Sequence, residues 1–192
     1  MAVRDILQIG DPRLKAKNKV VTNHKSQRVQ RVLKDLVDTM LSNELVGIAA
    51  PQIGENYQIL VTEPRKTELR ATDQTDKLRL YLNPKIIQFS KQKNVIYEGC
   101  GSVVHAELFG PVQRPKRITI EADDGKGKKF RLECDGLLAR VIQHEYDHLS
   151  GIEFTEKIIN YKKLTSLAFY LKEIKNSPAQ TKASKITIKH EF

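Results

Sequence analysis

Apolar residues recur at helical spacing in two segments of the chain. The first runs from Ser26, which can cap a helix, and its stripe comprises Val29, Val32, Leu33, Leu36, Val37, Met40 and Leu41. The second runs from Asp135 to Gly151, with its stripe at Leu137, Leu138, Val141 and Ile142. Asp135 is a possible N-cap, and Gly151 follows the last periodic residue, as expected where a helix ends. The pattern predicts two amphipathic helices.

Between these helices, short runs of β-branched, aromatic and aliphatic residues alternate with turn residues. The runs that predict strands are 57–63, 78–84, 94–99, 117–122 and 128–134. The last two flank DDGKG, which suits a hairpin turn, and the polar residues 64–77 predict a surface loop. This order predicts an α+β fold with mostly antiparallel sheets packed around the late helix.

The chain ends in a basic segment. From Lys157 to Phe192 it holds eight lysines and two glutamates. Over residues 160–175 a further apolar stripe predicts a helix docked by one face: Leu164, Leu167, Ala168, Leu171 and Ile174. Beyond Pro178 we expect loose or strand-like chain. The 192 residues therefore suit one domain over 1–160 and a basic C-terminal helix and tail over 161–192.

Composition narrows the class of protein. No apolar run has the length of a leader core or a membrane span, so we expect a protein that is neither exported nor inserted in a membrane. Cys100 and Cys134 are expected to be free thiols, or one of them a metal thiolate. The net charge of +10 favours attraction to phosphate polymers, with ordinary solubility as the alternative explanation.

The late helix carries the sequence QHEYDHL at residues 143–149. His144 and His148 are four apart and so share one helical face, with Glu145 beside them. Leu137 and Val141 lie on the same face, which indicates that the histidines point inward. A buried histidine pair beside a glutamate predicts a metal site, and a catalytic site of this kind normally has three protein ligands and one open position.

The third ligand has to come from elsewhere in the chain. Phe154 stands where the metzincin pattern would place a third histidine, so that pattern is excluded. Glu173 offers a thermolysin-like alternative, although no motif surrounds it. Cys100 lies between glycines in EGCGS, directly after a predicted strand, whereas Cys134 ends a strand and is more simply a core residue. The pattern favours Cys100, with Glu173 as the alternative.

Three motifs in order give the chain a resemblance to the peptide deformylase family. They are VGIAAPQ at 46–52, EGCGS at 98–102 and QHEYDHL at 143–149, and the flanks ILQIGDPRL, YLNPKI and DGLLARVIQHE agree. The resemblance covers residues 4–160 and implies that these form a catalytic domain. It also implies one divalent metal ion on Cys100, His144 and His148. Fe(II) would be the usual ion, with zinc, nickel or cobalt as substitutes.

The resemblance implies removal of the formyl group from formylmethionyl nascent polypeptides, with release of formate. In that reaction a metal-bound hydroxide attacks the formyl carbon and Glu145 acts as general acid and base. Gln52 and the backbone N–H of Gly101 would bind the oxyanion. The methionine side chain would enter an apolar pocket, for which the candidates are Val46, Gly47, Leu137 and Val141.

Partners and alternatives complete the expectations. The resemblance implies formylated nascent peptides as substrates and favours a ribosome contact through the basic tail. From the sequence we also expect a monomer that is cytoplasmic, in a bacterial cytosol or in an organelle. One alternative is an HExxH metallopeptidase with an atypical third ligand. Another is a non-catalytic, ribosome-associated protein that binds a structural metal.

Three positions depart from the family's usual pattern. Leu45 stands where a second glycine is usual, Gly101 where leucine is common, and Val104 where proline is common, within a changed segment at 103–114. We therefore expect the substrate range to differ.

Overall fold

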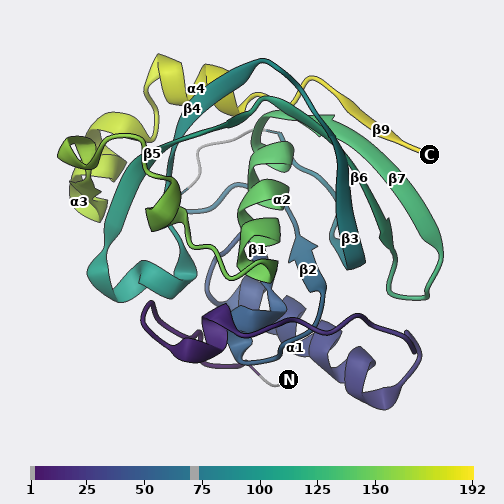
Figure 1. The fold of residues 1–192 in the computed structure, drawn as a ribbon. Helices are drawn as coiled ribbons and strands as arrows, with labels where there is room; N and C mark the ends of the chain where they lie inside the picture. Colours follow the sequence, from purple (N-terminus) through teal and green to yellow (C-terminus); the bar gives the residue numbers. More distant parts are fainter. Residues whose placement is uncertain (1–2, 70–73) are drawn as a thin grey trace.

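The computed structural model describes residues 3–69 and 74–192, and it has a mixed α/β fold with mostly antiparallel sheets (Figure 1). One sheet has six strands in the order β1-β2-β3-β6-β7-β9: β1 (Gly47–Ala49), β2 (Ile59–Thr62), β3 (Arg79–Phe89), β6 (Arg117–Asp123), β7 (Lys129–Asp135) and β9 (Lys189–Glu191). The other has the order β4-β5-β8: β4 (Lys93–Glu98), β5 (Leu108–Pro115) and β8 (Thr165–Ser166). All pairings between these strands are antiparallel.

The longest helices among the described residues are α1 and α2. In α1 (Gln27–Ser42), the hydroxyl of the N-cap Ser26 accepts a hydrogen bond from the N–H of Val29, as its sequence predicts. The apolar stripe of α1 packs on β1 and β2. Helix α2 (Gly136–Leu149) lies between the two sheets in Figure 1 and contacts β1, β2 and β7. Gly151, just beyond α2, has a φ of +70°, the left-handed conformation expected at a helix end.

Asp135 occupies the predicted N-cap position, but the prediction that its side chain caps the helix is wrong. Asp135 does precede α2, but its carboxylate makes no capping bond. It accepts instead from the backbone N–H groups of Thr187 and Ile188, at 2.6 and 2.9 Å. The carboxylate therefore fastens the C-terminal segment to the start of the helix.

All the predicted strand runs contain strands, but β5 was missed. Its sequence includes Pro111 and Pro115, which argue against an internal strand. Pro111 stands opposite Tyr97. The main-chain groups of Tyr97 point away from β5 to another partner, so this position requires no N–H from the proline. In the predicted loop 64–77, the described parts 64–69 and 74–77 hold no named helix or strand, and 70–73 lie outside the described residues.

The predicted helix over 160–175 is broken. It begins as a 3-10 turn at Tyr161–Lys163 and becomes helical only at α3 (Leu167–Phe169), which runs into a π-helical turn at Tyr170–Ile174. Between them, β8 pairs with Leu108 and Phe109 of β5. The buried anchor is Tyr170, stacked on Phe109 at a centroid distance of 4.0 Å, whereas Leu164 and Ala168 of the predicted stripe are exposed.

The rest of the tail also packs on the protein. After α4 (Pro178–Ser184), the chain forms β9 beside β7, in agreement with the strand-like expectation. The tail thus contributes a strand to each sheet. Within the described residues, no helix has both the length and the apolarity that crossing a membrane requires.

Candidate metal centre and substrate cleft

Three donor atoms converge where α2 faces the end of β4. The side chains of Cys100, His144 and His148 place one donor atom each within 4.8 Å of one another. The Sγ of Cys100 lies 3.2 Å from Nε2 of His148. The two histidines lie one turn apart on α2, and Cys100 follows β4 of the other sheet. The structure therefore brings together the ligands that the sequence favours.

The other candidate ligands lie elsewhere. Glu173, half exposed in the π-helical turn, forms an ion pair with Lys172 at 3.3 Å. Cys134 is buried in the apolar core of the six-stranded sheet, and burial raises the pKa of its thiol far above the usual value. Neither residue belongs to a group of potential metal ligands within the part of the chain that the structure describes.

The donor set suits a divalent transition metal. Nδ1 of His144 lies 2.9 Å from the Glu98 carboxylate, so this nitrogen donates and Nε2 is the atom that faces the other donors. Burial lowers the pKa of His144, but Cys100 and Glu98 outweigh it and raise the pKa well above the usual value, so this imidazole gives up a proton when it binds a metal ion. Burial lowers the pKa of His148 well below the usual value, which keeps its imidazole neutral as metal binding requires. One cysteine sulfur and two imidazoles fit a tetrahedral site with one open position. The residues present therefore fit a catalytic metal ion.

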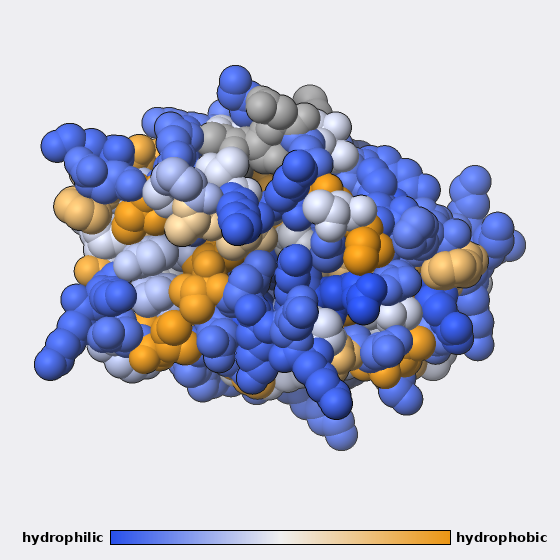
Figure 2. All heavy atoms as spheres, turned by 90° about the horizontal axis from the view of Figure 1, so that it is seen from above, coloured by the Kyte–Doolittle hydropathy of each residue, from blue (hydrophilic) through white to orange (hydrophobic). Residues whose placement is uncertain are grey.

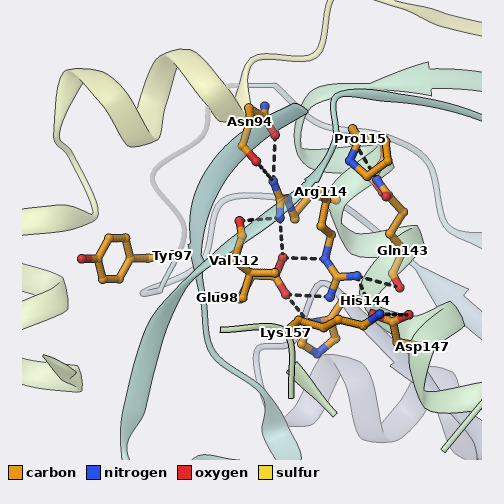
Figure 3. A network of polar contacts seen from close by, with 12 residues as sticks. Asn94, Tyr97, Glu98, Val112, Arg114, Pro115, Gln143, His144, Asp147 and Lys157 are labelled. Atoms are coloured by element: carbon orange, nitrogen blue, oxygen red, sulfur yellow. Dashed lines mark hydrogen bonds and ion pairs between the residues drawn. The ribbon is translucent and has the colours of Figure 1, made fainter. Parts of the chain in front are cut away.

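A buried ionic network fixes His144 from behind (Figure 3). Arg114 donates two hydrogen bonds to the carboxylate of Glu98, at 2.8 and 3.0 Å, and Arg140 donates a third at 2.8 Å. Burial alone would raise the pKa of Glu98, but these guanidinium groups and His144 hold it well below its usual range. Arg114 also bonds Asp147 on α2. Glu98 thus stays ionised and orients the imidazole.

This network was missed at the level of sequence. Glu98 belongs to EGCGS, so the motif contained a signal, but no local spacing links it to Arg114 and Arg140, which are 16 and 42 residues away.

Glu145 lies beside the donor atoms and is buried. Its Oε2 atom has no hydrogen-bond partner among residues 3–69 and 74–192. Burial raises the pKa of this carboxyl to about 7. Gly47 allows β1 to approach α2 closely. A Cβ at position 47 would lie 2.4 Å from Cγ1 of Val141 and 2.9 Å from Oε1 of Glu145. A carboxyl group poised to exchange a proton near neutral pH therefore faces the centre.

Gln52 reaches the same place from the turn after β1. Its Oε1 accepts from the N–H of Ala49 at 2.8 Å, which fixes the orientation of the amide. Its Nε2 then points to Oγ of Ser102 at 3.2 Å and to Sγ of Cys100 at 3.5 Å. Gly101 begins the 3-10 turn that follows the cysteine, at Gly101–Ala106. Two predicted donors thus lie on the border of the centre.

An apolar cleft opens beside the centre. The predicted pocket residues Val46, Gly47, Leu137 and Val141 all line it, together with Gln52, Glu145 and His144. Val46, Leu137 and Val141 pack against one another in a small cluster. Leu167 and Gln180 of the tail also line the cleft, which the sequence did not suggest.

The unusual residues Leu45 and Gly101 are neighbours in the fold. A Cβ built on Gly101 would stand 3.1 Å from Cδ1 of Leu45 and 3.4 Å from Cδ1 of Ile6. The Leu45 side chain therefore occupies the space into which a side chain at position 101 would extend. The two departures from the family's pattern compensate each other in volume.

This contact predicts strong coupling between the two positions. Gly101→Leu alone should overpack the site and lower the free energy of unfolding by about 1–3 kcal/mol. Adding Leu45→Gly should recover most of that loss, although the same change made alone is destabilising. Urea unfolding of the wild type, both single variants and the double variant measures the coupling. Additive losses would show that the two side chains do not share one space.

Comparisons of the sequence with known proteins all match one family. The family model described as polypeptide deformylase matches residues 3–164. The peptide deformylase of Dictyoglomus turgidum is 36% identical over 162 residues, which cover 84% of this chain and 97% of that protein. The enzyme of Bartonella quintana is 33% identical over 180 residues, 94% of this chain and 98% of that one.

Solved structures give the same result. The crystal structure of peptide deformylase from Ehrlichia chaffeensis in complex with actinonin has a TM-score of 0.75 and 31% identity, and the match covers 91% of this chain and 97% of that one. The Met-Ala-Ser-bound class I type b peptide deformylase from Acinetobacter baumannii has a TM-score of 0.75 and 28% identity, with 82% and 99% covered.

Proposed function

This chain belongs to the polypeptide deformylase family, and we propose that Cys100, His144 and His148 hold the metal ion on which the family depends. The family removes N-formyl groups from nascent peptides, and this chain is a hydrolase of that kind. The observation that carries the ligand assignment is the convergence of one sulfur and two imidazoles within 4.8 Å. Helix α2, with its HExxH sequence, serves as the central scaffold of this site.

The proposed physiological ion is Fe(II), with zinc, nickel or cobalt as substitutes. A thiolate and two imidazoles are suitable ligands for all of these ions, so the donor set supports the group as a whole. When bound, such an ion lowers the pKa of water from about 15.7 towards 7 and so supplies a nucleophile at neutral pH.

Glu145 moves the protons of the reaction. As the water oxygen bonds to the formyl carbon, the Glu145 carboxylate accepts the proton that the water gives up. When the bond between carbon and nitrogen breaks, Glu145 delivers that proton to the departing amine, and formate is the other product. A carboxyl whose pKa is about 7 is suited to both transfers near neutral pH.

Gln52 and Gly101 stabilise the oxyanion. The amide of Gln52 is held by its bond from the N–H of Ala49, so its Nε2 hydrogens are aimed before substrate binds. The backbone N–H of Gly101 supplies the second donor, and prearranged donors of this kind cost little reorganisation during reaction. The methionine side chain enters the pocket formed by Val46, Gly47, Leu137 and Val141, a role supported by their position beside the metal ligands.

One assay tests the activity. Protein loaded anaerobically with Fe(II) is incubated with formyl-Met-Ala-Ser, and formate is measured. Unblocked peptides of the same sequence and longer internal peptides serve as controls. Formate release without cleavage of the controls is expected. Cleavage of internal bonds would instead support the metallopeptidase alternative, and a bound metal without any hydrolysis would support the binding protein.

We also propose that the protein acts as a cytoplasmic monomer and that its tail contacts the ribosome. All the catalytic groups lie within residues 1–160 of a single chain, and nascent peptides are made in the cytosol or in an organelle. The face in Figure 2 is largely hydrophilic with small apolar patches, which suits a polar partner. Exposed lysines of the tail, such as Lys162, Lys163 and Lys172, would meet ribosomal phosphates.

Charge substitution tests the ribosome contact better than truncation, because truncation would also remove β8, β9 and the Tyr170 stack. Changing Lys162, Lys163 and Lys172 to glutamine should weaken co-sedimentation with ribosomes by about tenfold at low salt. The control changes three exposed lysines of the β6–β7 hairpin, Lys126, Lys128 and Lys129. Equal sedimentation of both triple variants with the wild type would exclude the tail as the contact.

A further inference from the structure

The tail closes one edge of the substrate cleft. Strand β4 is the edge strand of its sheet, and α4 packs against it (Figure 1). Gln180 of α4 bonds both main-chain groups of Tyr97 in β4. The N–H of Tyr97 donates to Oε1 of Gln180 at 3.0 Å, and Nε2 of Gln180 donates to the carbonyl of Tyr97 at 3.1 Å. The side-chain amide therefore pairs with β4 as a peptide group of a neighbouring strand would.

Several contacts hold Gln180 in this position. Ser177 caps α4 and accepts from the N–H of Gln180, while Pro178 starts the helix. Asn94 of β4 donates to the carbonyl of Ala183 at 3.0 Å, so a second bond ties α4 to the same strand. Gln180 is only 7% exposed. The amide is a fixed part of the cleft wall.

The occupied position lies on the path of an extended substrate. Main-chain groups of a strand alternate in direction, and Gly99 directly follows the last residue of β4, so an extended peptide that continues the strand pairing would meet Gly99 on the same edge as Tyr97. Gly99 and Tyr97 both line the cleft, and Cys100 follows directly. A peptide whose formyl group lies at the metal centre would have its first residue beside Gly99. Its third residue would then meet Tyr97, where Gln180 already provides the pairing.

We propose that Gln180 is a specificity-determining residue that limits main-chain recognition of the formylated peptide to its first two residues. This inference rests on the proposed function. Because Gln180 satisfies Tyr97, a third substrate residue gains no strand pairing on β4. The enzyme consequently accepts formylated chains with little regard to their length beyond the second residue.

Peptide length provides the test. C-terminally amidated formyl-Met-Ala, formyl-Met-Ala-Ser and a formylated pentapeptide are compared by kcat/KM, with protein loaded anaerobically with Fe(II). The wild type should show values within about twofold across the series. In Gln180→Ala, kcat/KM for the two longer peptides should rise about 3- to 10-fold relative to the dipeptide, through KM, as one net hydrogen bond becomes available. Thr181→Ala, an exposed neighbouring position, should keep the wild-type ratio.

Amide hydrogen exchange gives an independent reading. In Gln180→Ala the N–H of Tyr97 should exchange faster than in the wild type, and added Met-Ala-Ser amide should restore its protection while Met-Ala amide should not. Gln180→Ser, whose short side chain cannot reach both main-chain groups of Tyr97, provides a second variant if the alanine variant unfolds, and its length ratio should shift in the same direction. An unchanged length ratio in folded variants, or an equal change for all peptides, overturns the inference. Failure of the wild type to deformylate even the dipeptide would refute the proposed function instead.

Discussion

Replacing Glu145 by glutamine is expected to reduce kcat for deformylation by about 10²- to 10⁴-fold while the protein keeps its metal ion. The substitution preserves the shape of the side chain but removes the group that accepts and returns the proton. Cys100, His144 and His148 are untouched, so the metal content should match the wild type. Formate release gives kcat, and elemental analysis of the purified variant gives the metal stoichiometry.

The chain offers a matched control for this variant. Glu153 is also buried, burial also raises its pKa, and its Oε1 has no hydrogen-bond partner among the described residues. Glu153→Gln should therefore change kcat by less than about twofold, because a buried carboxyl that lies outside the metal centre takes no part in proton transfer to the substrate. Loss of metal from Glu145→Gln would mean that Glu145 is a ligand. Retained turnover would mean that another group is the base.

The fold could be predicted from sequence wherever local pattern decides it. The periodic stripe of α1 and the strand runs around DDGKG needed no distant partner to be recognised. The pattern failed where tertiary contacts override it. Thr165 and Ser166 would continue a helix by apolar periodicity, but they pair with β5, and the helix starts only after them. Pro111 is tolerated in β5 because Tyr97, opposite to it, bonds Gln180 instead.

The candidate site divides in the same way. His144, Glu145 and His148 were recognisable because helical spacing alone places them together. Glu98, Arg114 and Arg140 act as a unit only after two sheets enclose α2, and none of them shows a local spacing that reveals this. Gln180 is farther still, 83 residues from Tyr97. Long-range polar contacts of this kind follow from the completed fold, so a single sequence gives no signal for them.

Replacing Cys100 by serine is expected to weaken metal binding by more than about 100-fold. Removing a residue that only hydrogen-bonds to a ligand weakens metal binding by about 10- to 100-fold, so the loss of a ligand itself should exceed that range. A hydroxyl is a much poorer donor than a thiolate. The surroundings also suit sulfur, because the N–H of Ser102 lies 3.4 Å from Sγ and Nε2 of Gln52 lies 3.5 Å from it. Deformylation should fall with the metal content.

The second cysteine provides the control for this variant. Cys134 is fully buried in the core, so Cys134→Ser should cost about 1–3 kcal/mol of unfolding free energy by burying a hydroxyl, while the metal stoichiometry stays unchanged. Competition with a chelator measures metal affinity, and urea unfolding measures stability. Cys100→Ser should thus lose metal affinity, whereas Cys134→Ser should lose stability and keep its metal affinity. Normal iron affinity in Cys100→Ser would exclude this cysteine as a ligand and would leave the centre with two histidines and an unidentified third group.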